Sequence, residues 1–133
     1  MFQDKVFEKA GLDEMWTYIG KRENDIWIWT GVFDKDLKFF EIGKRDENTF
    51  WNFYYQIPLA KEIQTDGYKV YRNLENHKVK KYGYTNWNEG LHSFLRSKLA
   101  MLKRKTKAYA KSFRALYRAL ALVFVRWNLL STY

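Results

Sequence analysis

The sequence contains no cysteine, only one proline and only seven glycines. The absence of cysteine excludes disulfide bonds and thiolate metal sites. Few prolines and glycines, with 47% hydrophobic residues, indicate a single folded domain over residues 1–133 rather than a disordered linker. The first 11 residues include acids and no apolar run, so no signal peptide is predicted. The longest apolar run, Ala119–Val125, is far shorter than the roughly 20 residues of a membrane span. The basic amphipathic segment Lys111–Leu129 could lie on a membrane surface, but packing on the sheet explains its apolar face more simply, so we expect no membrane partner.

Acidic residues are almost missing from residues 85–133. This region has ten Lys or Arg and a single acid, Glu89, and therefore holds the whole formal net charge of +9. A basic run is often a solvated face, but exposed helices normally mix both signs of charge. The imbalance therefore indicates an anionic partner, most commonly nucleic acid. The candidate phosphate contacts are Arg96, Lys98, Lys103, Arg104, Lys105, Lys107 and Lys111.

Apolar and aromatic patterning predicts three strands after a short N-terminal tail over residues 1–12. A polar turn follows the first strand and Asp34-Lys35-Asp36 follows the second, which is typical of an antiparallel meander. The second strand is apolar on both faces, as expected in the middle of a sheet. The three predicted strands are Asp13–Gly20, Ile26–Phe33 and Leu37–Gly43.

Helices and strands alternate in the rest of the chain. Asp46 is a predicted helix N-cap, and Pro58 ends that helix. The later predicted elements are a strand at Glu62–Asp66, a short helix at Tyr68–Leu74, a strand at Val79–Tyr84, a long helix from Thr85 or Asn86, and a last helix at Lys111–Leu129. The order β-β-β-α-β-α-β-α-α predicts an α/β fold with a mixed sheet, as in ribonuclease H-like domains.

The long basic helix has two faces at 100° per residue. One is an apolar stripe that we expect to be buried, consisting of Leu91, Phe94, Leu95, Leu99 and Leu102. The opposite stripe, expected to face solvent, consists of Glu89, His92, Ser93, Arg96, Lys103 and Lys107. On that face His92 either contacts a DNA phosphate, orients Glu89 or has only a packing role. Trp87, beside the helix start, either stacks on a base or packs.

Three carboxylates stand at the ends of predicted elements. Asp13 opens the first strand, Asp66 ends the fourth, and Glu89 lies near the start of the long helix. If the first and fourth strands are neighbours, all three can converge into an oxygen-ligand site for Mg²⁺. Two such ions about 3.5–4 Å apart can promote phosphodiester transfer. The same acids could instead have purely structural roles: Asp66 precedes Gly67 in a predicted turn, and Glu89 in the first helical turn interacts favourably with the helix dipole. Either Asp13 or its neighbour Glu14 could be the inward acid.

Three blocks of the chain resemble the insertion-sequence-1 type transposases, which are bacterial and archaeal recombinases with an Asp-Asp-Glu catalytic set. The blocks are Asp13–Gly20 (DEMWTYIG), Thr65–Tyr71 (TDGYKVY) and Glu89–Ser112 (E-x5-LR-x5-L-x-RKT-x5-S). The resemblance implies a ribonuclease H-like catalytic domain in which Asp13, Asp66 and Glu89 bind two Mg²⁺ or Mn²⁺ ions. It further implies strand cleavage by water, followed by attack of a 3′-hydroxyl on target DNA.

The resemblance also carries departures and expectations about partners. His92 stands where the family usually has Asn. Related transposases have an upstream zinc-binding and helix-turn-helix part, so we expect this chain to be the product of a second reading frame with no end-recognition domain of its own. The expected partners are element ends, target DNA, the upstream part and further copies of the chain, in a prokaryotic cytoplasm at the nucleoid. The alternative is a truncated, catalytically inactive copy that only binds DNA.

Overall fold

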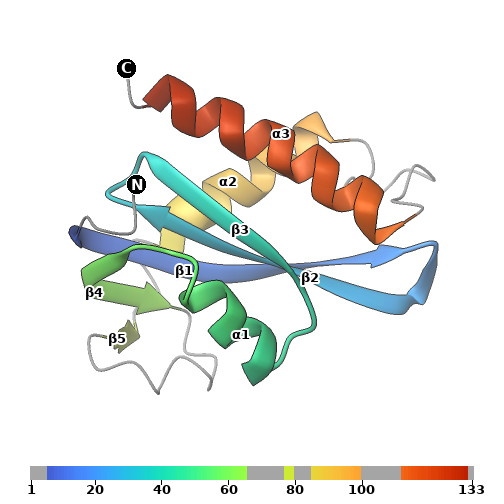
Figure 1. The fold of residues 1–133 in the computed structure, drawn as a ribbon, viewed down its shortest axis with the longest axis horizontal. Helices are drawn as coiled ribbons and strands as arrows, with labels where there is room; N and C mark the ends of the chain where they lie inside the picture. The colour runs from blue at the N-terminus through green and yellow to red at the C-terminus, as the bar shows by residue number, and fades with distance from the viewer. Residues whose placement is uncertain (1–5, 66–76, 80–84, 100–111, 132–133) are drawn as a thin grey trace.

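The computed structural model describes residues 6–65, 77–79, 85–99 and 112–131 (Figure 1). Its strands form one mixed sheet in the order β3-β2-β1-β4-β5. The elements in chain order are β1 (Val6–Ile19), β2 (Lys21–Phe33), β3 (Leu37–Gly43), α1 (Glu47–Tyr54), β4 (Leu59–Thr65), β5 (His77–Val79), α2 (Thr85–Lys98) and α3 (Phe113–Ser131). The mixed sheet and the alternation of strands and helices confirm the predicted α/β class.

Strands β1, β2 and β3 form the predicted antiparallel meander. Tight turns join them: Gly20 has φ +73, and Asp34 and Lys35 have φ 48 and 75. The Asp34 carboxylate stabilises its turn by accepting a hydrogen bond of 2.9 Å from the Lys9 amide. The predicted bounds of the third strand, Leu37–Gly43, are confirmed.

The first strand is longer than predicted. Val6–Leu12 belong to β1 rather than to an N-terminal tail, and Asp13 lies inside the strand rather than at its start. The reason is that this segment pairs in parallel with β4, from Val6 opposite Leu59 to Gly11 opposite Gln64. The exposed Glu8 and Lys9 interrupt its apolar pattern. The first and fourth strands are therefore neighbours, which is the condition on which the predicted carboxylate site depends.

Two smaller elements also differ from their predicted bounds. β4 is described over Leu59–Thr65, so it starts earlier than predicted, and the predicted last residue, Asp66, lies outside the described residues. β5 covers His77–Val79, and the predicted strand beyond Val79 lies outside the described residues. The predicted helix at Tyr68–Leu74 also lies outside them.

The sheet carries a separate apolar core on each face. Helix α1 covers one face, capped as predicted by Asp46, whose carboxylate accepts from the Thr49 amide at 2.9 Å. Buried side chains of this core include Trp29, Phe33, Phe50 and Phe53. Helices α2 and α3 cover the other face (Figure 1), with Met15, Ile28, Val32, Leu91, Leu95, Leu116, Leu120 and Phe124 buried between them and the sheet. Both faces of the central strands are therefore closed to solvent.

Helix α3 packs on the sheet through only part of its apolar face, because Phe113 and Tyr117, which share that face by helical spacing, are 47% and 46% exposed. Leu116, Leu120 and Phe124 face the sheet, and Phe124 lies against Phe40 of β3 with ring centroids 4.7 Å apart. Asn128 joins the same strand, with its amide oxygen and nitrogen bonded to the Lys38 backbone at 2.9 and 2.7 Å. No helix in the described ranges is long and apolar enough to cross a membrane.

Candidate active site

Asp13 faces the side of the sheet that α2 covers. It pairs with Thr30 of β2, and the alternation of side chains places Asp13 and Thr30 on the same face as Met15, Ile28 and Val32. Asp13 is half-buried, and its Oδ1 accepts a hydrogen bond of 2.9 Å from the Glu14 amide. The Asp13 carboxylate therefore lies in the middle of the sheet. Both its own strand, β1, and the neighbouring β2 contact α2.

Glu14 points to the opposite face and has a structural partner. Its Oε1 accepts from Arg45 Nε and Nη2 at 3.0 and 2.8 Å, and its side chain is only 2% exposed. The Arg45 guanidinium also lies 4.9 Å from the Trp27 ring centroid. Of the two adjacent acids, Asp13 is the one on the α2 face, and Glu14 belongs to an ion pair on the other side.

The start of α2 is fixed to β2 by a buried polar cluster. Thr30 Oγ1 lies 2.7 Å from His92 Nε2, and Asn88 Nδ2 donates to Thr30 Oγ1 at 3.0 Å and to the Thr30 carbonyl at 3.1 Å. Thr30 Oγ1 also donates to the Asp13 carbonyl at 3.2 Å. We call Thr30, Asn88 and His92 the polar clamp. All three residues are buried, so the clamp connects the helix that carries Glu89 to the strand pair that carries Asp13.

Neither Thr30 nor Asn88 was among the predicted site residues. Two signals in the sequence could have identified them. Thr30 is the only polar side chain in the apolar run Ile26–Phe33, and a lone hydroxyl in a buried strand needs a partner. Asn88 and His92 are four residues apart, so they share one face of a helix.

The expectation that His92 lies on the exposed stripe of the basic helix is wrong. The side chain is 5% exposed, on the same buried face as Leu91 and Leu95. Burial, and secondarily the nearby Arg96 charge, lowers the pKa of His92 from 6.5 to about 4. At neutral pH the imidazole is therefore uncharged and enclosed, so it offers no positive charge to a DNA phosphate. Packing and an orienting role for Glu89 remain open for His92.

Burial of neutral His92 predicts acid sensitivity. Because the folded pKa is below the unfolded value, the unfolded chain binds the extra proton, and stability falls as the pH decreases from about 6.5 towards 4. Between pH 7.5 and pH 5 we expect His92 alone to lower the free energy of unfolding by about 2 kcal/mol. Urea unfolding at both pH values measures this loss. His92→Gln cannot titrate and should show a smaller pH dependence; equal dependence in both proteins would contradict the assignment.

The remaining predicted residues of α2 have different positions. Glu89 is exposed, as the stripe predicted, and Arg96 is half-buried close to His92. Trp87 is partly buried against the core under α2, which supports packing over base stacking. Lys98 is the last residue of α2. The other predicted DNA contacts, Lys103, Arg104, Lys105, Lys107 and Lys111, lie outside the described residues, as does Asp66.

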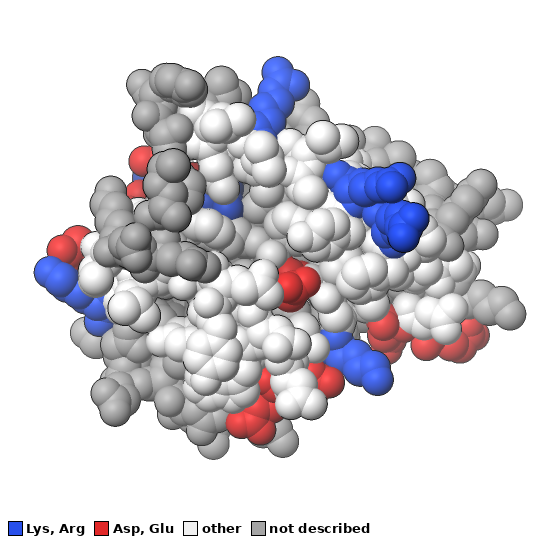
Figure 2. Space-filling model, in the orientation of Figure 1, with Lys and Arg blue, Asp and Glu red and all other residues white. Residues whose placement is uncertain are grey.

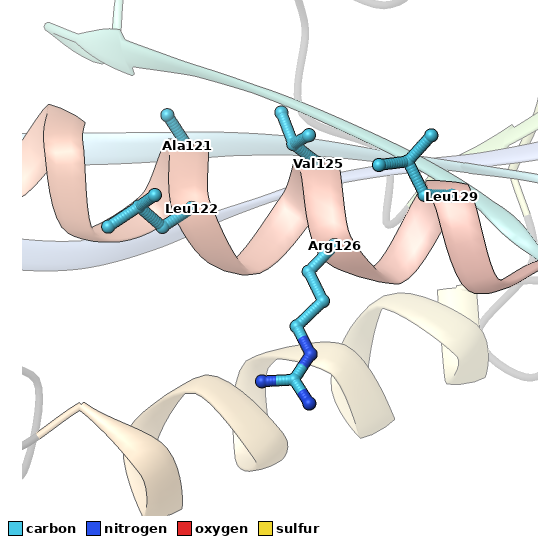
Figure 3. Close-up of a pocket in the computed structure, with 5 residues that line it drawn as sticks. All are labelled: Ala121, Leu122, Val125, Arg126 and Leu129. Carbon is cyan, nitrogen blue, oxygen red and sulfur yellow. The ribbon is translucent and has the colours of Figure 1, made fainter.

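The surface offers little further definition of a ligand site. The view in Figure 2 shows acidic and basic side chains in small separate groups over the described residues, without one continuous basic surface. A shallow hollow on α3 is lined by Ala121, Leu122, Val125, Arg126 and Leu129 (Figure 3). Its lining is almost wholly apolar, so it does not suit a phosphate. None of the predicted site residues lies in it.

The residue types of the predicted ligand set suit a hard cation. Within the described ranges no three His, Asp or Glu side chains converge on a metal position. Two carboxylates, Asp13 and Glu89, come from β1 and α2, which lie against each other. The third predicted ligand, Asp66, follows β4 directly in the chain. Carboxylate oxygens are the ligands that Mg²⁺ and Mn²⁺ prefer, so the residue types fit the predicted metal.

Comparison with solved structures identifies the fold. No family model matches the sequence, and the search of curated proteins found no match. The structure resembles that of the HTLV-2 integrase catalytic core domain in complex with magnesium (trimeric form), with a TM-score of 0.50 and 13% sequence identity, over 85% of this chain and 82% of that one. The predicted ribonuclease H-like fold is thereby confirmed: the chain has the fold of an integrase catalytic core.

Proposed function

We propose that this chain is the catalytic domain of a DNA transposase, of the insertion-sequence-1 type that its three sequence blocks resemble. It would cut DNA at element ends with a divalent metal and join the 3′-hydroxyl to target DNA. The observation that carries the proposal is the position of Asp13: mid-sheet, paired with Thr30 under α2, on a strand whose parallel neighbour leads into Asp66. The likeness to an integrase core with bound magnesium supports it.

The register of β1 and β4 supports a role for Asp66. Gly11 pairs with Gln64 in a parallel ladder. Asp13 is two residues beyond Gly11, and Asp66 is two residues beyond Gln64. If the register continues, the two aspartates are direct neighbours at the point where β4 ends. Glu89 on α2 would be the third ligand, held at the first turns of the helix by the polar clamp.

In this proposal the carboxylates of Asp13, Asp66 and Glu89 hold one or two Mg²⁺ or Mn²⁺ ions, which would activate the attacking hydroxyl and neutralise charge at the phosphate. Water would attack a phosphate at the element end and release a 3′-hydroxyl. That hydroxyl would then attack a phosphate of the target DNA and displace the 3′-oxygen of the target strand. Arg96 is the described basic residue best placed for the DNA backbone, because it lies on α2 two turns after Glu89. The chain beyond α2 supplies more Lys and Arg for the same purpose.

We also propose that the chain acts as an oligomer on DNA, because transposition joins two element ends; the integrase neighbour was solved as a trimer. Target-strand binding would then depend on several basic segments at once. Such binding is salt-dependent, with the observed affinity falling as phosphate contacts release counterions.

A DNA cleavage assay tests the proposed function. The full chain is incubated with end-labelled duplex DNA carrying a 3′-hydroxyl nick, with Mn²⁺, with Mg²⁺ or with EDTA, and cleaved and joined products are separated on a denaturing gel. We expect metal-dependent products that Asp66→Asn removes by about 10³-fold, since losing a metal ligand costs several kcal/mol of transition-state stabilisation. DNA affinity, measured by fluorescence anisotropy, should stay within about twofold because the basic residues are intact. Tight, salt-sensitive DNA binding without metal-dependent products would instead identify an inactive DNA-binding copy.

A further inference from the structure

Thr30 occupies an unusual position among the residues of the site. Its hydroxyl contacts both elements that supply the described carboxylates: the Asp13 carbonyl on β1 at 3.2 Å, and His92 and Asn88 on α2 at 2.7 and 3.0 Å. Thr30 has no carboxylate of its own and is fully buried. It therefore cannot touch a substrate, but it can fix the distance between the strand and the helix.

The hydrogen-bond pattern of the clamp is directional. If His92 Nε2 carries the proton, it donates to Thr30 Oγ1, as Asn88 Nδ2 does, and the hydroxyl proton goes to the Asp13 carbonyl. This arrangement uses both acceptor positions and the one proton of the hydroxyl. A neutral His92 suits it, and a hydrophobic contact in place of the hydroxyl could satisfy neither donor. The clamp thus specifies one position of α2 along β2.

Asn88 makes an energetically unfavourable arrangement in this position of α2. Its Oδ1 is buried and has no hydrogen-bond partner among the described residues, although its nitrogen is bonded twice to Thr30. A buried acceptor without a partner is unfavourable, and an apolar side chain would avoid the loss. A polar residue at this position is explained if its hydrogen bonds to Thr30 serve to place the next residue, Glu89.

We propose that Thr30, acting through Asn88 and His92, is a positioning residue that sets Glu89 relative to Asp13 for metal binding. The inference rests on the proposed function for the role of the metal. Its structural part, that the Thr30 hydroxyl locks the start of α2, does not. Residues that orient metal ligands typically change metal affinity by about 10–100-fold when replaced.

The test uses Thr30→Val, which keeps the branched shape and removes the hydroxyl, and Thr30→Ser, which restores it. Thr17→Val is the matched control, because Thr17 is a buried threonine on β1 outside the clamp. We expect Thr30→Val to raise the Mn²⁺ concentration for half-maximal cleavage about tenfold. It should also speed hydrogen exchange of the amides from Trp87 to Leu95 about tenfold relative to those of β1–β2, because the helix start loses its anchor. Thr30→Ser and Thr17→Val should stay within about twofold of the unmodified chain in both measurements.

Each outcome separates the two ideas. An unchanged Mn²⁺ requirement in Thr30→Val, or faster exchange spread evenly over the sheet, overturns the positioning role while leaving the proposed function intact. Absence of metal-dependent cleavage in the unmodified chain overturns the proposed function. The hydrogen exchange of α2 in Thr30→Val then still tests whether the Thr30 hydroxyl fixes the start of that helix. If Thr30→Val does not fold, Asn88→Leu replaces it, since that change also removes the unpartnered Oδ1. It should give the same local exchange and the same direction of Mn²⁺ shift, and failure to do so counts against the inference.

Discussion

Replacing Asp13 with asparagine is expected to slow metal-dependent DNA cleavage by about 10³-fold and to leave the fold intact. The rate falls because an amide oxygen is a weaker ligand than a carboxylate, and several kcal/mol of transition-state stabilisation are lost with it. The fold should survive because Asp13 Oδ1 accepts from the Glu14 amide, and an asparagine Oδ1 can accept the same bond. Single-turnover cleavage of labelled DNA measures the rate, and thermal unfolding measures the stability.

The controls for this prediction are acids outside the site. Asp25→Asn changes an exposed carboxylate that accepts from Trp16 Nε1 at 2.8 Å, and the amide can keep that bond. Glu23→Gln is the matched control for Glu89→Gln, since both glutamates are exposed. We expect both controls to cleave at the unmodified rate and Glu89→Gln to lose activity as Asp13→Asn does. Full activity in Asp13→Asn would remove β1 from the metal site.

Replacing Arg45 with methionine is expected to destabilise the fold by about 3 kcal/mol at pH 7. The change leaves the Glu14 carboxylate, whose side chain is 2% exposed, without its positive partner. Breaking a buried pair typically costs about 3–5 kcal/mol, and the lower end applies here because Arg45 is 38% exposed. Urea unfolding monitored by tryptophan fluorescence gives the free energy of unfolding directly.

A double-mutant cycle distinguishes the ion pair from lost packing against Trp27. Glu14→Gln combined with Arg45→Met removes both charges, so the double variant should regain at least half of the stability lost in Arg45→Met. None of these changes should alter metal dependence, because the pair lies on the α1 face of the sheet. If the double variant were as unstable as the single one, packing of Arg45 rather than its charge would be responsible.

Much of the fold could be predicted from the order of apolar patterns. The strand Leu37–Gly43 and the Asp46 cap followed from local spacing. The adjacency of the first and fourth strands was only a condition for the predicted site, and the structure meets it. The early start of β1 did not follow from local spacing, because Glu8 and Lys9 are exposed there and interrupt the apolar pattern. Pairing with β4 holds that segment, and pairing between distant strands leaves little trace in local sequence.

The site was harder to predict for two physical reasons. Adjacent residues of a strand point to opposite faces, and both faces of this sheet are covered by helices, so burial could not choose between Asp13 and Glu14. Helical spacing assigned His92 to the polar, exposed side, because it treats polar residues as solvated. That assumption fails when the facing strand offers a buried hydroxyl, as Thr30 does.

The parallel ladder between β1 and β4 also bears on the order in which this chain folds. The turns between β1, β2 and β3 close over a few residues, whereas β4 reaches β1 only after both of those strands and α1 have been traversed. Closing that longer loop costs more chain entropy, so we expect the meander to assemble first and β4 to dock later. Asp13 and the segment leading to Asp66 would then meet only at that late step. Under the proposed function, metal-dependent cleavage would require this docking step, and a folding intermediate without docked β4 would be inactive.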